Sequence, residues 1–256
     1  MTPYQRSPVQ PLSLDSIVDV VNVYTDRDRA ETFARLILGE AQAFGGRARI
    51  LDVGCGRGLG ANERTRLTSL EAIRACAIEF WGCEPDPGIV PTSLLDRFER
   101  GTLQSAMLPF TYFDIIYAHY VVEHVSDPSS FFQKVHALLR PGGRFIFMTP
   151  NAKHYFVKIA RVIAAVGLET PILKLLHPGA AAVHYPTKYL VNDADVVERL
   201  ARETGFSRCD FAYFEHGDLR SYFPRSLRWI PTGLERVLAG LRRPEHLPGL
   251  VVRLEK

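Results

Sequence analysis

The sequence predicts an α/β fold in which helices cover a mostly parallel sheet. Short apolar runs typical of buried strands alternate with longer segments of helical spacing, and the clearest runs are 50–53, 115–118 and 144–149. A glycine-rich stretch follows the first run directly. Because ligands of such sheets bind beyond the carboxyl ends of the strands, this corner is the first candidate for a ligand site.

The glycine-rich stretch begins at Ile50 and reads ILDVGCGRGLG. Its glycines occupy every second position: Gly54, Gly56, Gly58 and Gly60. Glycines at this spacing weaken a strand, because they lose the most backbone entropy and present no side chain to pack. The stretch therefore predicts a tight turn whose backbone comes close to a ligand.

A dinucleotide-binding turn is one alternative, since it also carries small residues at fixed spacing. Counted from Gly54, its third small residue would be Leu59, which is too large. Counted from Gly56 it is Ala61, but the turn would then begin too late after the strand. A nicotinamide-dependent reductase stays open as the alternative.

The string DVGCGRG resembles the first motif of the class I S-adenosylmethionine-dependent methyltransferases. In that family the glycines pass beneath the methionine part of the cofactor, and the acidic residue of the strand helps to anchor the loop. The resemblance implies a cofactor-binding turn made by Asp52, Gly54, Cys55, Gly56 and Gly58. It also implies a Rossmann-like sheet of seven strands with the last one antiparallel, helices on both faces and a helical lid.

The second strand is expected to end at Glu84. The segment 61–80 lacks proline and glycine, which predicts a helix, and Trp81 to Glu84 follows as the end of a strand. In the family an acidic residue here binds the ribose, since a carboxylate can accept hydrogen bonds from both vicinal hydroxyls. Because Glu84 lies more than the usual 20 or so residues from Asp52, the predicted helix is longer than the family norm.

The stretch 100–110 resembles the third strand of the family and the loop that holds the adenine. Alignment on the Leu-Pro-Phe at its end places Gln104 and Ser105 at the adenine-binding positions. The family commonly has an acidic residue where this chain has Gln104, and an amide oxygen can also accept from the adenine amino group.

The segment 113–125, FDIIYAHYVVEHV, resembles the fourth strand and the turn after it. The resemblance implies that His119 contacts the methionine part of the cofactor and that His124 lies near the acceptor. Methylation of an oxygen needs a base that titrates near neutrality, and His124 is the expected base. His154 and His184 are weaker candidates. The quinone O-methyltransferases have E-x-x-E-H here, whereas this chain has Tyr120 at the first carboxylate position, so no catalytic metal is expected.

The resemblance covers about 47 to 151 and implies the remaining organisation. An N-terminal helical segment, 1–46, precedes a methyltransferase domain, 47–256, which carries a lid at 152–190 and an amphipathic insertion at 216–248. A helix capped by Asn192 or Asp193 and closed by a glycine precedes the sixth strand.

Composition narrows the partners and the location. The net charge of +3 is too small to imply nucleic acid, and the motifs of DNA methylation are missing. Four cysteines without a C-x-x-C pair and an N-terminus without a signal-peptide pattern lead us to expect a cytoplasmic protein. Basic and apolar residues interleave at 225–243, which leaves peripheral membrane contact open.

The function expected from the resemblance is methyl transfer from S-adenosylmethionine, by in-line displacement, to a small-molecule, sugar or lipid-linked acceptor, with oxygen favoured as the methylated atom. Besides the reductase, a methyltransferase-like protein that binds the cofactor without turnover stays open. The acceptor and the oligomeric state are not predicted.

Overall fold

The computed structural model describes residues 29–56, 59, 63–167, 187–214, 225–227, 229–240 and 244–256. Predictions that fall on Gly58, on His184, on most of the lid and on much of the 216–248 insertion lie outside the described residues. No helix in the described ranges is both long enough and apolar enough to cross a membrane.

The core of the fold is a sheet of seven strands in the order β3-β2-β1-β4-β5-β7-β6. The strands are β1 (Ala48–Val53), β2 (Ala77–Glu84), β3 (Arg97–Arg100), β4 (Phe113–His119), β5 (Leu139–Pro150), β6 (Arg208–Phe214) and β7 (Gly249–Glu255). The first five pair in parallel, and β7 runs antiparallel to both β5 and β6. The predicted seven-stranded, mostly parallel sheet is confirmed.

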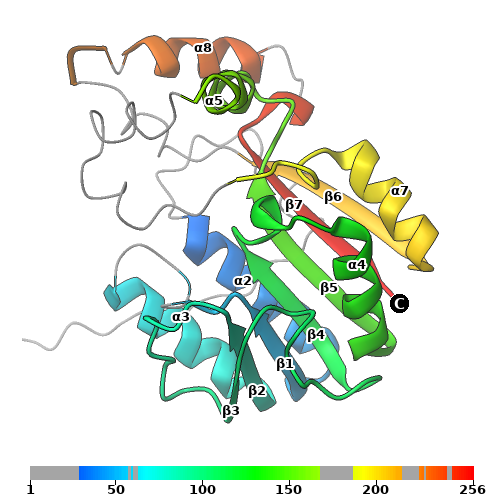
Figure 1. Ribbon diagram of the computed structural model, residues 1–256. Helices are drawn as coiled ribbons and strands as arrows, with labels where there is room; N and C mark the ends of the chain where they lie inside the picture. The colour runs from blue at the N-terminus through cyan, green and yellow to red at the C-terminus, as the bar shows by residue number, and fades with distance from the viewer. Residues whose placement is uncertain are drawn as a thin grey trace, which may run out of the picture.

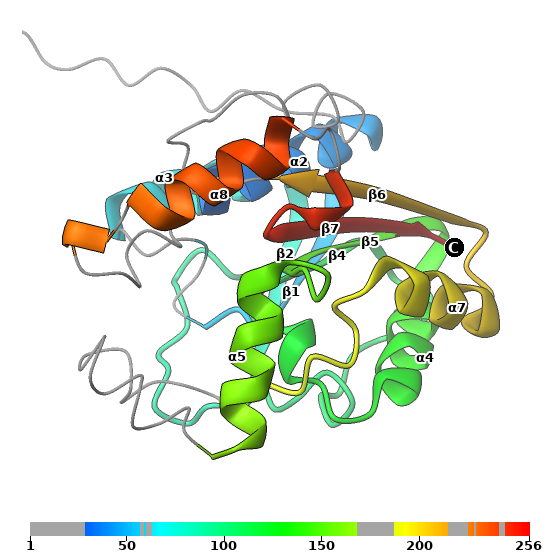
Figure 2. The ribbon, with the colours of Figure 1, turned by 90° about the horizontal axis from the view of Figure 1, so that it is seen from above.

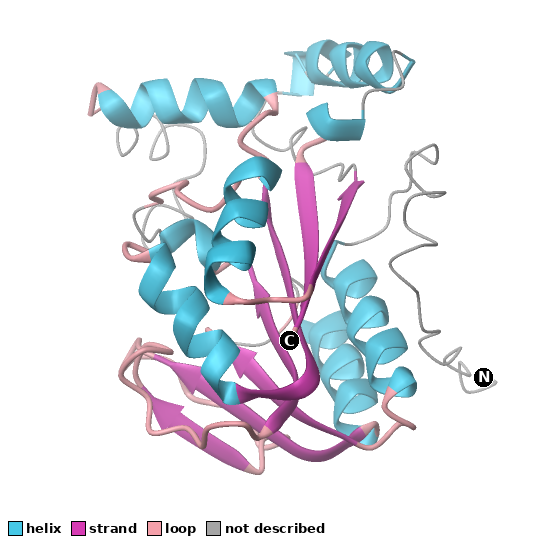
Figure 3. Ribbon diagram, turned by 90° about the vertical axis from the view of Figure 1, so that its right-hand side faces the viewer, coloured by secondary structure: helices cyan, strands magenta, loops and turns pink. Residues whose placement is uncertain are grey.

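Helices cover both faces of this sheet (Figure 3). One face packs against α2 (Arg29–Ala43) and α3 (Glu63–Ala75), and the other against α4 (Pro128–Leu138) and α7 (Ala194–Thr204). The alternation of side chains along a strand separates the two cores, so that Ile50 joins the first and Leu51 the second.

The remaining helices gather at one end of the sheet. After β5 the chain continues into α5 (Tyr155–Ala165), and α8 (Trp229–Gly240) precedes β7. Figure 1 shows both helices above the sheet, and Figure 2 views the molecule from that end. Three short 3-10 turns complete the described elements: η1 (Val122–His124), η3 (Arg225–Leu227) and η4 (Pro244–His246).

The prediction of a single helix over 61–80 is wrong. The helix α3 ends at Ala75, and β2 begins at Ala77. The helix ends in a tight turn at Cys76, whose N–H donates a hydrogen bond to Ile73 O at 3.0 Å. Parallel pairing with β1 then holds 77–84 as a full strand of eight residues. The long spacing between Asp52 and Glu84 therefore includes the full strand β2, and the described helix α3 has 13 residues.

The helix caps follow the sequence prediction. Asp193 caps α7 by accepting a hydrogen bond from the N–H of Asp195, and Gly205 ends the helix in the left-handed region at φ 97°. Asp127 caps α4 in the same way. A side-chain acceptor satisfies one of the free N–H groups in a first helical turn, which is why these residue types begin helices.

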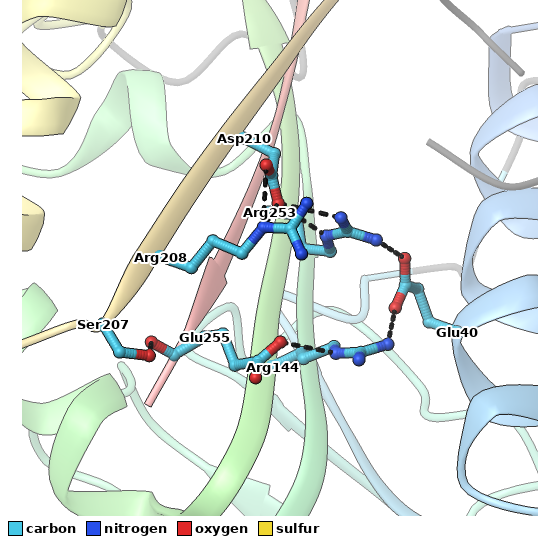
Figure 4. Close-up of polar contacts among 7 residues, drawn as sticks. All are labelled: Glu40, Arg144, Ser207, Arg208, Asp210, Arg253 and Glu255. Carbon is cyan, nitrogen blue, oxygen red and sulfur yellow. Dashed lines mark hydrogen bonds and ion pairs between the residues drawn. The ribbon is translucent and has the colours of Figure 1, made fainter. Parts of the chain in front are cut away.

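A largely buried cluster of ion pairs connects α2 with the strands β5 and β7 (Figure 4). Glu40 of α2 pairs with Arg144 of β5 at 2.6 Å and with Arg253 of β7 at 2.9 Å. Arg253 also pairs with Asp210 at 2.8 Å, and Arg144 with Glu255 at 3.2 Å. Because Glu40 is only 5% exposed and both its oxygens are paired, the cluster fixes the position of α2 on the sheet.

Candidate active site

The glycine-rich turn leaves β1 beside the end of β2. Val53 pairs with Cys83, and the N–H groups of Gly54 and Cys55 donate to Cys83 O at 2.8 and 3.1 Å. Gly54 has φ 65°, and a Cβ built on it would lie 2.6 Å from Val121 Cγ2. A side chain at residue 54 would therefore collide with the turn that follows β4, so this close approach requires glycine.

Gly56 is different, because a Cβ placed there would make only ordinary van der Waals contacts with the described residues. It has φ 48°, and the nearest atoms to a Cβ placed there are Glu84 Oε2 and Gly54 O, both at 3.7 Å. Its N–H donates to Glu84 Oε2 at 2.9 Å, and the N–H of Asp86 donates to Glu84 Oε1 at the same distance. The carboxylate of Glu84 thus connects the glycine turn to the end of β2.

This donor and acceptor set fits the nucleoside part of S-adenosylmethionine. Each oxygen of the Glu84 carboxylate accepts one backbone N–H and keeps lone pairs for hydroxyl donors. Glu84 is 7% exposed, so hydrogen bonds to it would be charge-assisted and shielded from water. Gly56, which has no side chain, lies directly beside these oxygens.

Asp52 lies in β1 beneath the turn and accepts a hydrogen bond from Tyr117 Oη at 2.8 Å. Desolvation raises the pKa of Asp52 to about 8, against the effect of the Tyr117 hydrogen bond and with a smaller contribution from Glu84. Burial likewise raises the pKa of the Cys55 thiol, and it raises that of Cys83 to about 12. The pair of Asp52 and Tyr117 supports the turn from below, and the two thiols stay protonated near neutral pH.

The loop with the predicted adenine contacts meets the same edge of the sheet. The N–H of Gly101 donates to Glu84 O at 3.1 Å, which places the turn 101–106 next to the end of β2. Ser105 Oγ contacts Thr102 Oγ1 at 3.1 Å within this turn, and Gln104 is exposed. The structure brings both residues to the Glu84 side of the site, and their contact with adenine stays a prediction.

Two histidines approach the corner from β4. His119 is the last residue of β4, and its ring stacks on Phe33 of α2 with centroids 5.2 Å apart and planes at 29°. His124 ends the turn η1, and its N–H donates to Val121 O at 3.0 Å. Since the Val121 side chain contacts Gly54, the turn that carries His124 adjoins the glycine turn.

A chain of buried polar residues, which the sequence did not indicate, begins at Glu123, the residue before His124. Thr149 Oγ1 donates to Glu123 Oε2 at 3.2 Å, and Asn192 Nδ2 donates to Thr149 Oγ1 at 2.6 Å. All three residues are at most 3% exposed. The sequence singled out Asn192 only as one of two helix caps. In the structure Asp193 provides the cap, which leaves the Asn192 side chain directed inward.

His154 lies just before α5 and is 1% exposed. Its Nδ1 accepts a hydrogen bond from Phe156 N at 3.3 Å. The pKa of His154 is lowered to about 4, chiefly by desolvation and to a smaller extent by electrostatic interaction with His246 and Lys158. A histidine with this pKa is a weak base, which favours His124 over His154 as the proton acceptor.

Among the described residues, no group of three or more His, Cys, Asp and Glu side chains is arranged to hold a metal ion. Glu123, which belongs to the E-H pair of the motif, is engaged by Thr149 instead. The expectation that catalysis needs no metal stays a prediction.

Sequence comparison connects this geometry with known proteins. A family model described as a methyltransferase domain matches residues 25–230, which is most of the chain. A ubiquinone biosynthesis O-methyltransferase from Ruegeria pomeroyi is 30% identical over 151 residues, which cover 56% of this chain and 53% of that protein. The protein of the same name from Vibrio cholerae is 32% identical over 155 residues, or 56% of each chain. The chain therefore matches about half the length of these relatives.

Solved structures share the fold. An S-adenosylmethionine-dependent methyltransferase from Mesorhizobium loti superposes with a TM-score of 0.51 at 18% identity, over 89% of this chain and 98% of the other. A geranyl diphosphate methyltransferase in complex with GPP and sinefungin superposes with a TM-score of 0.56 at 13% identity, over 87% of this chain and 77% of the other. At these identities the likeness concerns the fold alone.

Proposed function

Since the chain belongs to the methyltransferase-domain family, we propose that it transfers the methyl group of S-adenosylmethionine to an oxygen of a small-molecule acceptor. The observation that carries the proposal is the corner where the N–H of Gly56, in the glycine turn, donates to the buried carboxylate of Glu84. The relatives from Ruegeria pomeroyi and Vibrio cholerae, which bear the name of O-methyltransferases, support oxygen as the methylated atom.

The chain supplies binding and alignment. Gly54 and Gly56 give the turn its close backbone approach, and Glu84 is in position to accept hydrogen bonds from a ribose. S-adenosylmethionine, when bound, supplies a methyl group already activated on a sulfonium. The protein therefore has to align the acceptor and to exclude water, and orientation alone can lower a barrier by roughly 7–11 kcal/mol in the best cases.

His124 is the proposed base. It lies one residue beyond the buried Glu123, in the turn η1 that contacts Gly54 through Val121. An imidazole changes its protonation near neutral pH, so it can remove the proton that an acceptor hydroxyl loses on methylation. Asp52 is buried beneath the turn and accepts a hydrogen bond from Tyr117 Oη, so it is not placed to reach an acceptor hydroxyl.

The choice of cofactor is tested by isothermal calorimetry. The intact chain is titrated with S-adenosylhomocysteine and, separately, with NAD and NADP. We expect binding of S-adenosylhomocysteine alone. Binding of a nicotinamide dinucleotide would favour the reductase, while cofactor binding without turnover over a wide panel of acceptors would favour a binding module.

The role of His124 is tested by replacing it with alanine. Loss of a general base typically lowers turnover by about 10²–10⁴-fold, whereas the affinity for S-adenosylhomocysteine should stay as in the wild type. Transfer of a radiolabelled methyl group to a hydroxylated acceptor gives the rate. An unchanged rate in His124→Ala would mean that another group, or none, removes the proton.

We also propose that α5 contacts an anionic membrane surface, from which a lipid-linked acceptor would be reached. Ile159, Val162 and Val166 are each more than half exposed, and Lys158 and Arg161 are exposed beside them. Apolar side chains flanked by basic ones are typical of helices that lie in the membrane interface. Trp229, which begins α8, is 71% exposed at the same end of the molecule.

Co-sedimentation with vesicles tests this contact. We expect binding to mixed phosphatidylglycerol and phosphatidylcholine vesicles, weaker binding to phosphatidylcholine alone, and loss of binding in Val162→Asp. Ile78→Asp is the matched control, because Ile78 is an exposed apolar residue at the opposite, amino-terminal end of β2. Equal sedimentation of both variants would contradict the proposal.

A further inference from the structure

The polar chain that runs from Asn192 through Thr149 to Glu123 has a fixed direction. Asn192 Nδ2 can only donate to Thr149 Oγ1, so the Thr149 hydroxyl directs its own hydrogen bond to Glu123 Oε2 at 3.2 Å. The Thr149 oxygen accepts from Asn192 Nδ2 at 2.6 Å. Each hydrogen bond in the chain thus points toward the buried carboxylate.

The orientation of the Asn192 amide is fixed by a second contact. Asn192 Nδ2 also donates to Pro150 O at 2.9 Å, and a carbonyl oxygen can only accept. The amide therefore cannot be turned the other way. This leaves Asn192 Oδ1 as a buried acceptor without a hydrogen-bond partner among the described residues, in a side chain that is 1% exposed.

Such an atom calls for an explanation, because burying an unpaired polar group costs about 1–3 kcal/mol. Asn151, the first residue after β5, provides the contrast. Its Nδ2 donates to the carbonyls of Glu245 and Leu247 at 2.8 and 2.7 Å, and its Oδ1 accepts from Lys153 N at 3.0 Å. Of two buried asparagines at the end of β5, one is satisfied within the protein and the other presents an acceptor.

Asn192 lies at the edge of the sheet where the acceptor must bind. Its backbone carbonyl accepts from Ala152 N at 2.7 Å, just beyond the carboxyl end of β5. Its side chain reaches Glu123 through Thr149, and Glu123 precedes the proposed base His124. The same turn touches Gly54 through Val121, so the chain of bonds ends beside the glycine turn.

We propose that Asn192 Oδ1 accepts a hydrogen bond from a hydroxyl group of the acceptor, which makes Asn192 a specificity-determining residue. The two donations by Nδ2 polarise the amide and make its oxygen a better acceptor. A methyl ether in the same place would leave Asn192 Oδ1 unpaired and would be discriminated against. This inference rests on the proposed function and deepens it, since it assigns a hydroxyl donor to the acceptor.

The test uses the full chain saturated with S-adenosylhomocysteine and two probes, catechol and its dimethyl ether. Calorimetry should show that the wild type binds catechol more tightly than the ether. In Asn192→Ala the affinity for catechol should fall by about tenfold, while the affinity for the ether stays nearly the same. Thr149→Val keeps the shape of the side chain and should weaken catechol binding less, and Thr149→Ser should restore it.

Asn151→Ala is the control, because it removes a buried asparagine whose hydrogen bonds are all internal. It should lower thermal stability without changing the preference for catechol over the ether. If Asn192→Ala does not fold, the comparison of Thr149→Val with Thr149→Ser decides instead.

Several results would overturn the inference. One is a wild type that does not prefer catechol to its dimethyl ether. Another is an Asn192→Ala protein, or in its place a Thr149→Val protein, with unchanged preference. A wild type that binds no S-adenosylhomocysteine would instead overturn the proposed function itself, so the two failures are distinguishable.

Discussion

Glu84 ends β2 with each of its carboxylate oxygens accepting one backbone N–H, from Gly56 and from Asp86. The same side chain is buried beside Gly56. A single residue thus connects the glycine turn with the end of the second strand and places a carboxylate at this corner.

Neutralising Glu84 should weaken cofactor binding. Glu84→Gln keeps the size of the side chain and loses the charge, and hydrogen bonds to a charged group contribute about 1.5–3 kcal/mol. We expect the affinity for S-adenosylhomocysteine to fall by roughly 10- to 100-fold in calorimetry. Glu79→Gln is the matched control on the same strand, since Glu79 accepts hydrogen bonds from Trp81 and Tyr112 and lies nearer the other end of β2. Equal losses in both variants would contradict the role of Glu84.

His154 gives a prediction about pH. Its pKa is about 4 in the folded chain against an ordinary value of 6.5, because burial disfavours the charged ring. Between these values the unfolded chain binds the proton and the folded chain does not, so acid favours unfolding. The free energy of unfolding of the wild type should therefore fall relative to His154→Gln as the pH drops from 6.5 to 4, by up to about 3 kcal/mol.

Urea unfolding of both proteins across this range measures the difference. The raised pKa of Asp52 lowers the free energy of unfolding as the pH rises toward 8. Asp52 is present in both proteins, so its contribution cancels in the comparison. Parallel pH profiles would show that His154 does not titrate differently on folding.

At the residue scale, the sequence predicted the positions that a short motif specifies and missed those that only packing creates. Glu84 and Gly56 belong to local patterns of strand, turn and small residue. Asn192 and Thr149 meet across a separation of 43 residues, and no local pattern indicates that one turns toward the other. Long-range hydrogen bonds of this kind need the fold before they can be recognised.

At the scale of elements, α2 is a helix that precedes the first strand and contacts the predicted site residue His119. Its Phe33 stacks on His119, and its Glu40 pairs with Arg144 and Arg253 on β5 and β7. The sequence predicted an N-terminal helical segment but not these pairs. The ring contact places α2 over the end of β4, next to the glycine turn.

Breaking the buried cluster should destabilise the protein strongly. In Glu40→Gln, Arg144 and Arg253 each lose one of their two partners, and removing one member of a buried ion pair costs about 3–5 kcal/mol. Glu255→Gln also removes a partner of Arg144, but its side chain is 31% exposed, and exposed pairs contribute about 0–1 kcal/mol. Urea unfolding compares the two, and similar losses would mean that Glu40 is no more important than a surface pair.

The boundary between α3 and β2 shows where sequence patterns fail at the scale of elements. The residues 76–80 carry no glycine or proline, so nothing local ends the predicted helix. The ladder with β1 decides the matter, because Ile50 pairs with Phe80 and Leu51 with Trp81. Pairing between strands outweighs the weak local preference of a short apolar segment.

At the scale of the whole molecule, the strand order brings the predicted site residues to one edge of the sheet, as far as they lie in the described ranges. The ends of β1, β2 and β4 supply the turn at Gly54, the carboxylate of Glu84 and the histidines His119 and His124. The sequence predicted this arrangement because parallel strands end at a common edge. Figure 1 shows α5 and α8 beyond this end of the sheet. With α5 on a membrane, as proposed, a lipid-linked acceptor would enter between the membrane and the sheet.

The central claim is that the cofactor lies against the corner that Gly56 and Glu84 form. The most direct test is calorimetry with S-adenosylhomocysteine on the wild type, Gly56→Val and Gly142→Val. Both glycines have positive φ, 48° and 72°, and a Cβ at Gly142 meets nothing within 4 Å. Backbone strain is therefore similar in the two variants, while only Gly56→Val puts a side chain beside Glu84. We predict that Gly142→Val binds like the wild type and that Gly56→Val does not bind; wild-type affinity in Gly56→Val would contradict the account.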